Sequence, residues 1–294
     1  MSIASEITRL QTAKQDIATA IANKGVPTTG HGMDDFATDI AAIPAGGADD
    51  RVQKLLVSGG TIDLSDVTGM TFVPLYAFYK YGTSGREYQS IVLPPDVTSI
   101  GDNAFYQQNL LASVNLPSGI TTISGNAFRG CRSLVLTELP SSLTTLGRSV
   151  FYGCTNLNIH TVPSGLATIP QESFYSTGIR DFVIPSTVQT VDSNAVCNCA
   201  SLQILELCAK SVASYGFQNC YNLQYVWISA DCTTLNASAW NYAPFRNCTA
   251  LTDIYCEATA KPDGWGAYWN YKNQTTQITV HWGVSKADFE QLLP

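Results

Sequence analysis

Charge and histidine are scarce in this 294-residue sequence. Charged residues make up 13% of the chain, and 16 Lys and Arg residues stand against 23 Asp and Glu residues, for a net charge of −7. Nucleic-acid binding requires a basic surface, so we expect no nucleic-acid partner. The three histidines, His31, His160 and His281, lie in three separate regions and do not form a metal-ligand pattern.

Long apolar runs and common catalytic motifs are missing as well. No stretch approaches the roughly 18 apolar residues of a membrane-spanning helix, and the first residues, MSIASEITRL, lack the apolar core of a secretion signal. The strings G-x-S-x-G, H-E-x-x-H, G-x-x-x-x-G-K and G-x-G-x-x-G do not occur. We therefore expect no membrane insertion, no cofactor, no metal and no catalytic site.

A repeated phrase is what the sequence does contain. It is clearest in IGDNAFYQQNLLASVNLP and returns as ISGNAFRGCRSLVLTELP, LGRSVFYGCTNLNIHTVP and IPQESFYSTGIRDFVIP, with three weaker copies after them. Each copy carries one anchor residue, and in order the anchors are Phe105, Phe128, Phe151, Phe174, Val196, Phe217 and Phe245. Steps of 21 to 28 residues between anchors indicate a solenoid, in which stacked coils bury each other's faces.

The second half of each copy predicts a strand. A leucine or isoleucine follows the anchor, and apolar residues recur three and five positions later, an alternation typical of strands with one buried face. A proline then ends the strand in four copies, because proline has no N–H for the ladder. The inward column of the resulting parallel sheet includes Val114, Thr137, His160 and Phe182, which makes His160 a core histidine.

The segments I-G-x-x-A-F, C-x-x-L and V-x-L-P, repeated from about Leu93 to Cys256, resemble the BspA-like leucine-rich repeats of surface proteins and adhesins of bacteria and some protists. The resemblance covers over half the chain. It implies an α+β repeat fold, namely a right-handed leucine-rich-repeat solenoid with a parallel sheet. It also implies a binding function, because what such repeats share is a surface that binds something.

Two terminal regions flank the repeats. Residues 1–44 predict a short helical hairpin, which is too small to be stable alone and either caps the solenoid or serves in anchoring or homo-oligomerisation. Residues 45–50 form a linker, residues 51–257 the solenoid and residues 258–294 a C-terminal cap. Within the cap, TTQITVHW predicts a strand and residues 285–293 predict a closing helix, as an exposed solenoid end must be covered.

The N-terminal segments ITRLQTAKQDIATAIANKGV and GMDDFATDIAAIP resemble a region of tail and minor structural proteins of phages of Gram-positive hosts. In those proteins similar residues precede a distal binding module. The resemblance implies a location in the virion tail and contact with other virion tail proteins through the hairpin. It agrees with the missing secretion signal, since a virion protein released by lysis needs none.

The nine cysteines are an odd number, and five of them stand three residues after an anchor. A small thiol fits a tight buried corner, so we expect an inward column of free thiols, although neighbouring coils bring such columns within disulfide reach. Cys197 and Cys199 lack a second pair at zinc-ligand spacing.

The outward strand positions become aromatic toward the C-terminal copies. Ile204, Tyr225, Trp227 and Tyr255 are expected to cluster on one exposed face, where rigid rings suit stacking on sugars or anchoring a protein contact. These four are the candidate ligand-binding residues. The alternative is that the C-terminal cap folds back over them.

Two carboxylates are close enough to be weighed as a hydrolytic pair. Asp181 and Glu206 are expected on adjacent coils, offset by two residues and so about 8 Å apart at the usual strand spacing, which suits an inverting glycoside hydrolase. An open sheet offers no closed pocket to raise one pKa, so this is a remote alternative.

The sequence thus leads to two binding functions. The first is a non-enzymatic, phage tail-associated receptor-binding or adhesion protein that recognises a host cell-surface glycan or protein through the sheet face. The second is a bacterial cell-surface adhesin of the BspA-like type.

Overall fold

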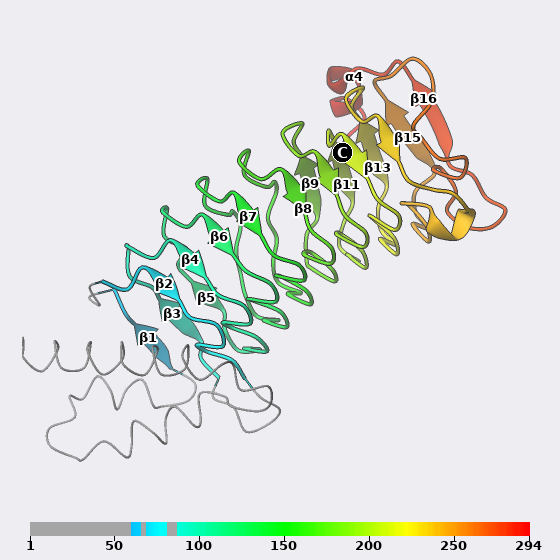
Figure 1. Ribbon diagram of the computed structural model, residues 1–294. Coiled ribbons are helices and arrows are strands. Elements are labelled where there is room, and N and C mark those ends of the chain that lie inside the picture. Colours follow the sequence, from blue (N-terminus) through cyan, green and yellow to red (C-terminus); the bar gives the residue numbers. More distant parts are fainter. Residues whose placement is uncertain (1–59, 66–68, 81–86) are drawn as a thin grey trace, which may run out of the picture.

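The computed structural model describes residues 60–65, 69–80 and 87–294 of the chain. They form a curved solenoid in which the coils follow one another in chain order (Figure 1). Each coil contributes a strand to one or both of two rows, which we call the front and back sheets, and the strand pairings within the described residues are parallel. The parallel-sheet solenoid predicted from the repeat is confirmed.

The strands are short, and each sheet is divided into two parts. The front sheet comprises β1 (Thr61–Asp63), β3 (Ser90–Val92) and β5 (Ser113–Val114), and then β9 (Asp181–Ile184), β11 (Ile204–Leu207), β13 (Tyr225–Ile228), β15 (Asp253–Cys256) and β16 (Thr279–Trp282). The back sheet comprises β2 (Phe72–Val73), β4 (Ser99–Ile100), β6 (Thr122–Ile123) and β7 (Thr145–Leu146), and then β8 (Thr168–Ile169), β10 (Thr190–Val191), β12 (Ser211–Val212) and β14 (Thr234–Leu235).

The anchors form the centre of the core, as the sequence predicts. All seven are fully buried, and the rings of Phe105, Phe128, Phe151 and Phe174 stack nearly parallel, with neighbouring centroids 4.8, 5.5 and 5.7 Å apart. Phe78 adds a ring at the N-terminal end, 5.1 Å from Phe105. One coil cannot bury its own anchor, so each ring depends on its neighbours in the stack.

The cysteine that follows an anchor donates its thiol to a backbone carbonyl of the preceding coil. The pairs are Cys131 with Phe105 at 3.0 Å, Cys154 with Phe128 at 3.0 Å, Cys199 with Phe174 at 3.1 Å, Cys220 with Val196 at 3.3 Å and Cys248 with Phe217 at 3.2 Å. All nine cysteines are free thiols, which confirms that prediction. Burial raises the pKa of Cys131, Cys199 and Cys220 well above 9.0, so these groups are structural and unreactive.

No helix belongs to the repeated coil, so the α+β description is wrong for the part of the chain in view. The reason is local. In the coil of Phe105, the residues two positions before and after the anchor, Asn103 and Gln107, have φ values of 55° and 61°. Later coils repeat this pair of left-handed residues, which a right-handed helix cannot contain. The predicted helical hairpin of residues 1–44 and the linker of residues 45–50 lie outside the described residues.

The front sheet is interrupted after β5 and resumes at β9. In the intervening coils of Phe128 and Phe151, the inward column predicted from sequence is wrong. Thr137 and His160 are exposed, and Leu136 and Ile159, one residue earlier, turn inward. Because the apolar residue sits one position too early for strand alternation, two exposed residues follow each other and the ladder is lost.

The back sheet is interrupted between β7 and β8, and a proline explains the break. At the equivalent place in neighbouring coils, Gly147 donates its N–H to Ile123 at 2.8 Å and Asp192 donates to Ile169 at 2.9 Å. Pro170 occupies that place directly after β8 and has no N–H to give.

When each coil is counted from its anchor turn to the back strand that follows, the coil of Phe128 ends with β7 and the coil of Phe151 ends with β8. Both sheets are therefore interrupted between these two coils. We call this junction the seam. It is bridged by the anchor turns, where Phe128 N–H bonds to Val150 O at 2.9 Å and Gly130 N–H bonds to Tyr152 O at 2.7 Å, and by the stacked anchor rings.

The C-terminal residues cover the end of the solenoid. Strand β16 pairs with β15, and the helix α4 (Lys286–Glu290) follows, with Ser285 as its N-cap; a short 3-10 helix, η1 (Trp240–Tyr242), precedes β15. Both elements predicted in this region are present. Trp265 and Trp269 are buried, and Trp282 packs against the core.

Candidate binding surface

The four candidate residues lie on three neighbouring front strands. Parallel pairing sets Ile204 of β11 beside Tyr225 of β13, and Trp227 of β13 beside Tyr255 of β15. The strands thus bring the side chains together on one face, as their spacing predicts. What the spacing alone could not show is how much of that face is open.

Trp227 does not belong to an exposed patch. It is 3% exposed, and its indole N–H donates to Val284 O at 3.0 Å, across 57 residues of chain. The segment between β16 and α4 lies over it, because a buried tryptophan N–H needs an acceptor and the returning backbone supplies one. The expectation of exposure is wrong for this residue, and the alternative that the cap folds back holds here.

Tyr255 is also engaged by the C-terminal segment. Its ring stacks on His281 with centroids 4.9 Å apart and packs against Phe289 of α4 at 5.6 Å. His281 in turn contacts Asp253, Nε2 to Oδ1, at 2.8 Å. The hydrogen bond from His281 holds the pKa of the Asp253 carboxyl below its ordinary value of 3.8, while burial raises the pKa of Tyr255.

Ile204 and Tyr225 are half-buried, as is Tyr255. Beside them, the Nζ atom of Lys286 on α4 lies 2.6 Å from Oε2 of Glu206. Helix α4 is thus held to the front sheet by an ion pair as well as by Phe289, which is fully buried. Ligand binding by Ile204, Tyr225 or Tyr255 stays a prediction.

The carboxylates considered for hydrolysis do not form a catalytic pair. Asp181 pairs with Ile204, and Glu206 with Val183, so the expected offset of two residues is present. However, the side chain of Glu206 is 12% exposed and carries the Lys286 ion pair, whereas Asp181 is exposed. One carboxylate is thus already paired with an ammonium group of α4, whereas the other is open to solvent.

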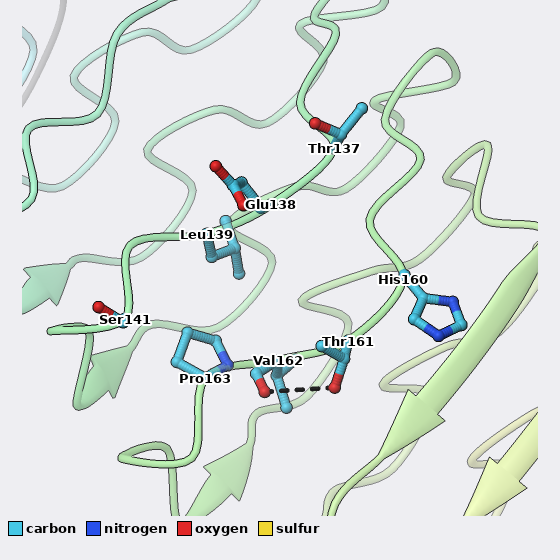
Figure 2. Close-up of a pocket in the computed structure, with 8 residues that line it drawn as sticks. All are labelled: Thr137, Glu138, Leu139, Ser141, His160, Thr161, Val162 and Pro163. Carbon is cyan, nitrogen blue, oxygen red and sulfur yellow. Dashed lines mark hydrogen bonds between the residues drawn. The ribbon is translucent and has the colours of Figure 1, made fainter.

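A groove at the seam escaped the sequence analysis. Its volume is about 300 Å³, and its lining residues are Thr137, Glu138, Leu139, Ser141, His160, Thr161, Val162 and Pro163. Figure 2 shows the two chain segments that line it, one from the coil of Phe128 and one from the coil of Phe151, running side by side in the same direction. The signal that could have revealed it is the apolar residue at the wrong position in both copies, at Leu136 and Ile159.

His160 lines this groove at the surface, and the core role predicted for it is wrong. It is exposed, and its Nδ1 atom lies 3.2 Å from Asp181 O. Across the described part of the chain, no group of His, Cys, Asp or Glu side chains has the arrangement of a metal site. The helices in that part are too short or too polar to cross a membrane.

Comparison with protein families gives one assignment. The model of the BspA type leucine rich repeat region matches in six copies, over residues 71–203 and 167–286. Among curated proteins, none matches the chain.

Several solved structures are similar to the chain. The T. pallidum leucine rich repeat protein is 24% identical, with a TM-score of 0.48, and the match covers 67% of this chain and 79% of that one. A leucine-rich repeat protein from Eubacterium ventriosum is 19% identical, with a TM-score of 0.44, and the match covers 58% of this chain and half, 50%, of that one. A leucine rich cell surface protein from Faecalibacterium prausnitzii is 17% identical, with a TM-score of 0.26, and the match covers 71% and 92% of the two chains.

Proposed function

The chain belongs to the BspA-type leucine-rich repeat family, and on that premise we propose that it is a non-enzymatic adhesin of the bacterial cell surface. The observation that carries the proposal is the repeat itself, matched over residues 71–203 and 167–286 and folded as an extended sheet-lined surface. Such a surface binds by area and shape. The described residues hold no metal cluster, and Glu206 is engaged in an ion pair with Lys286. The partner is a cell-surface glycan or protein of the host.

Retention of the purified full chain on host cells tests this proposal. Labelled protein is titrated onto intact cells, and saturable binding is expected. Pretreating the cells with trypsin removes binding if the receptor is a protein, and mild periodate oxidation removes it if the receptor is a glycan. The absence of saturable binding to cells of every host tested contradicts the adhesin function.

A second proposal is that the chain acts as a phage tail-associated receptor-binding protein. It is supported by the resemblance of the segments ITRLQTAKQDIATAIANKGV and GMDDFATDIAAIP to tail proteins. We propose that residues 1–44 then attach the chain to other tail proteins or make it a homo-oligomer. Mass spectrometry of purified virions decides the first point. Light scattering on the full chain and on a chain starting at Ala48 decides the second, since an assembly hairpin predicts an oligomer that becomes a monomer.

A further inference from the structure

We propose that the seam groove binds an extended peptide segment of a partner protein, which carries a basic side chain and completes the interrupted front sheet. The inference rests on the binding function proposed above and assigns it a site and a ligand class. Peptide binding by strand addition needs a free strand edge, pockets for alternate side chains and room for the added chain. The seam provides all three.

The coil of Phe128 supplies one free edge. Leu136 O accepts from Asn158 N–H across the seam, so the Thr137 N–H of the same peptide group points away from the groove. Successive peptide groups alternate between the two edges, which turns the Glu138 N–H toward the groove. This N–H donates no hydrogen bond to a described residue. The front ladder across the seam is reduced to one bond, from Asn158 N–H to Leu136 O at 3.2 Å. Backbone groups left unpaired at a strand edge are a template for pairing with another chain.

The coil of Phe151 supplies the facing edge. Its bonds to the next coil are made on the far side, where His160 O accepts from Val183 N–H at 2.8 Å and Thr161 forms an isolated parallel bridge with Val183. Along a strand, successive peptide groups alternate between the two edges. The N–H group of Thr161, which donates no hydrogen bond to a described residue, therefore faces the groove.

The lining has the alternation that an extended peptide needs. Leu139 and Val162 are buried and form an apolar floor, while Thr137, Glu138 and Thr161 are exposed along its rim (Figure 2). Side chains of a bound strand point alternately to opposite faces, so one set meets this floor and the other meets solvent and the polar rim.

The dimensions favour a short segment. Residues 137–139 span about 10 Å in an extended conformation, enough to pair with about three residues of a partner. A volume of about 300 Å³ is at the lower limit for sites that enclose a whole small molecule. An open groove of this size instead suits a chain that enters at one end and leaves at the other.

Charge selects the side chain. Glu138 is the acidic residue of the lining, which contains no Lys or Arg, and the whole chain carries a net charge of −7. A lysine or arginine of the peptide therefore finds a carboxylate on the rim and a favourable field around it.

The groove can be tested with displayed short linear random peptides as the probe. The full chain is used for selection, and selected peptides are synthesised and titrated by calorimetry. The peptides are expected to contain Lys or Arg, and N-methylation of their backbone should abolish binding. Thr161→Pro removes a groove-facing donor that the described residues do not use and should raise Kd about tenfold, the effect of losing one hydrogen bond. Glu138→Lys should do the same for basic peptides.

Two control variants match these changes elsewhere on the surface. Ser186→Pro places proline at the second position of an exposed turn, where it is tolerated, and Asp96→Lys makes the same charge change at an exposed site. Both should bind the peptides as the wild type does, and circular dichroism melts check that all four variants fold. Failure to select peptides, or equal binding by the wild type and both groove variants, overturns the proposal.

Cell retention separates the failure of this inference from failure of the proposed function. If the wild type binds cells saturably and both groove variants bind equally well, the inference is wrong and the adhesin function stands. Loss of binding after periodate treatment, with no effect of the groove variants, identifies a glycan bound elsewhere. If the wild type is not retained, the adhesin function fails regardless of the peptide result.

Discussion

Truncation of Trp227 tests whether the C-terminal segment closes over the front sheet. The side chain is 3% exposed and its indole N–H donates to Val284 O at 3.0 Å. Removing a large buried ring in Trp227→Ala should cost about 3 to 5 kcal/mol of the free energy of unfolding. In Trp227→Phe most of the ring volume remains but the Val284 carbonyl loses its donor, which should cost about 1 to 3 kcal/mol.

The location of the loss matters as much as its size. Solenoid stability is a sum of terms between neighbouring coils, so the damage should concentrate in β16, α4 and the segment joining them. Hydrogen exchange followed by mass spectrometry on residues 279–294 measures it, beside denaturant unfolding of the whole chain. Tyr221→Ala is the control, since Tyr221 is 48% exposed and its truncation should change stability by no more than about 0.5 kcal/mol.

One result would refute this reasoning. If Trp227→Ala leaves exchange in residues 279–294 unchanged while it weakens cell retention, Trp227 is an exposed binding residue and the closing segment does not cover it.

Three further predictions concern the core, the Asp253 pair and the thiols. Phe128→Ala should cost about 3 to 5 kcal/mol in denaturant unfolding, whereas truncation of Phe72, 52% exposed, should be nearly neutral. The pKa of the Asp253 carboxyl, measured by NMR, should lie below 3.8 and should return toward 3.8 in His281→Ala. Because the folded pKa is lowered, the ionised carboxyl stabilises the fold above pH 3.8, and this stabilisation is lost as the pH falls through the lowered pKa. At about pH 8 the native thiols should react slowly with a disulfide reagent, and all nine should react after unfolding. Cys208 should react first because it is half-buried, although burial raises its pKa to about 11. Fast labelling of the native anchor-turn cysteines contradicts the buried column.

The repeat allowed the core to be predicted almost residue by residue. Phe105, Phe128 and the other anchors are buried because nothing but a stacked coil can cover an apolar residue recurring at this step. The same rule failed at Thr137 and His160, where the position in the repeat argued for burial and the polarity of the side chain argued against it. The polar side chains stayed in solvent, because the apolar residue before each of them, Leu136 or Ile159, turned inward instead, at the expense of a few ladder bonds.

The candidate site was harder to predict for a different reason. The alternation in β13 correctly placed Tyr225 and Trp227 on the outward face of the front sheet, but an outward residue is exposed only if no later segment covers it. The covering contact joins residues 57 positions apart, and periodicity within a repeat carries no information about such a pairing. The seam groove was missed because it exists where the ladder hydrogen bonds of the sheet are absent, whereas the repeat pattern predicts a continuous ladder.

The seam has a mechanical consequence. When the molecule is pulled along its long axis, the junctions between coils bear the load in series, and the weakest one yields first. Between most coils, the load is shared among two ladders and the anchor turns. At the seam it falls on the anchor turns, the Phe128–Phe151 ring contact and the single ladder bond from Asn158 to Leu136. The solenoid therefore consists of two stiff halves joined by a weaker junction, and under tension the coils should first separate at the seam, near the middle of the molecule.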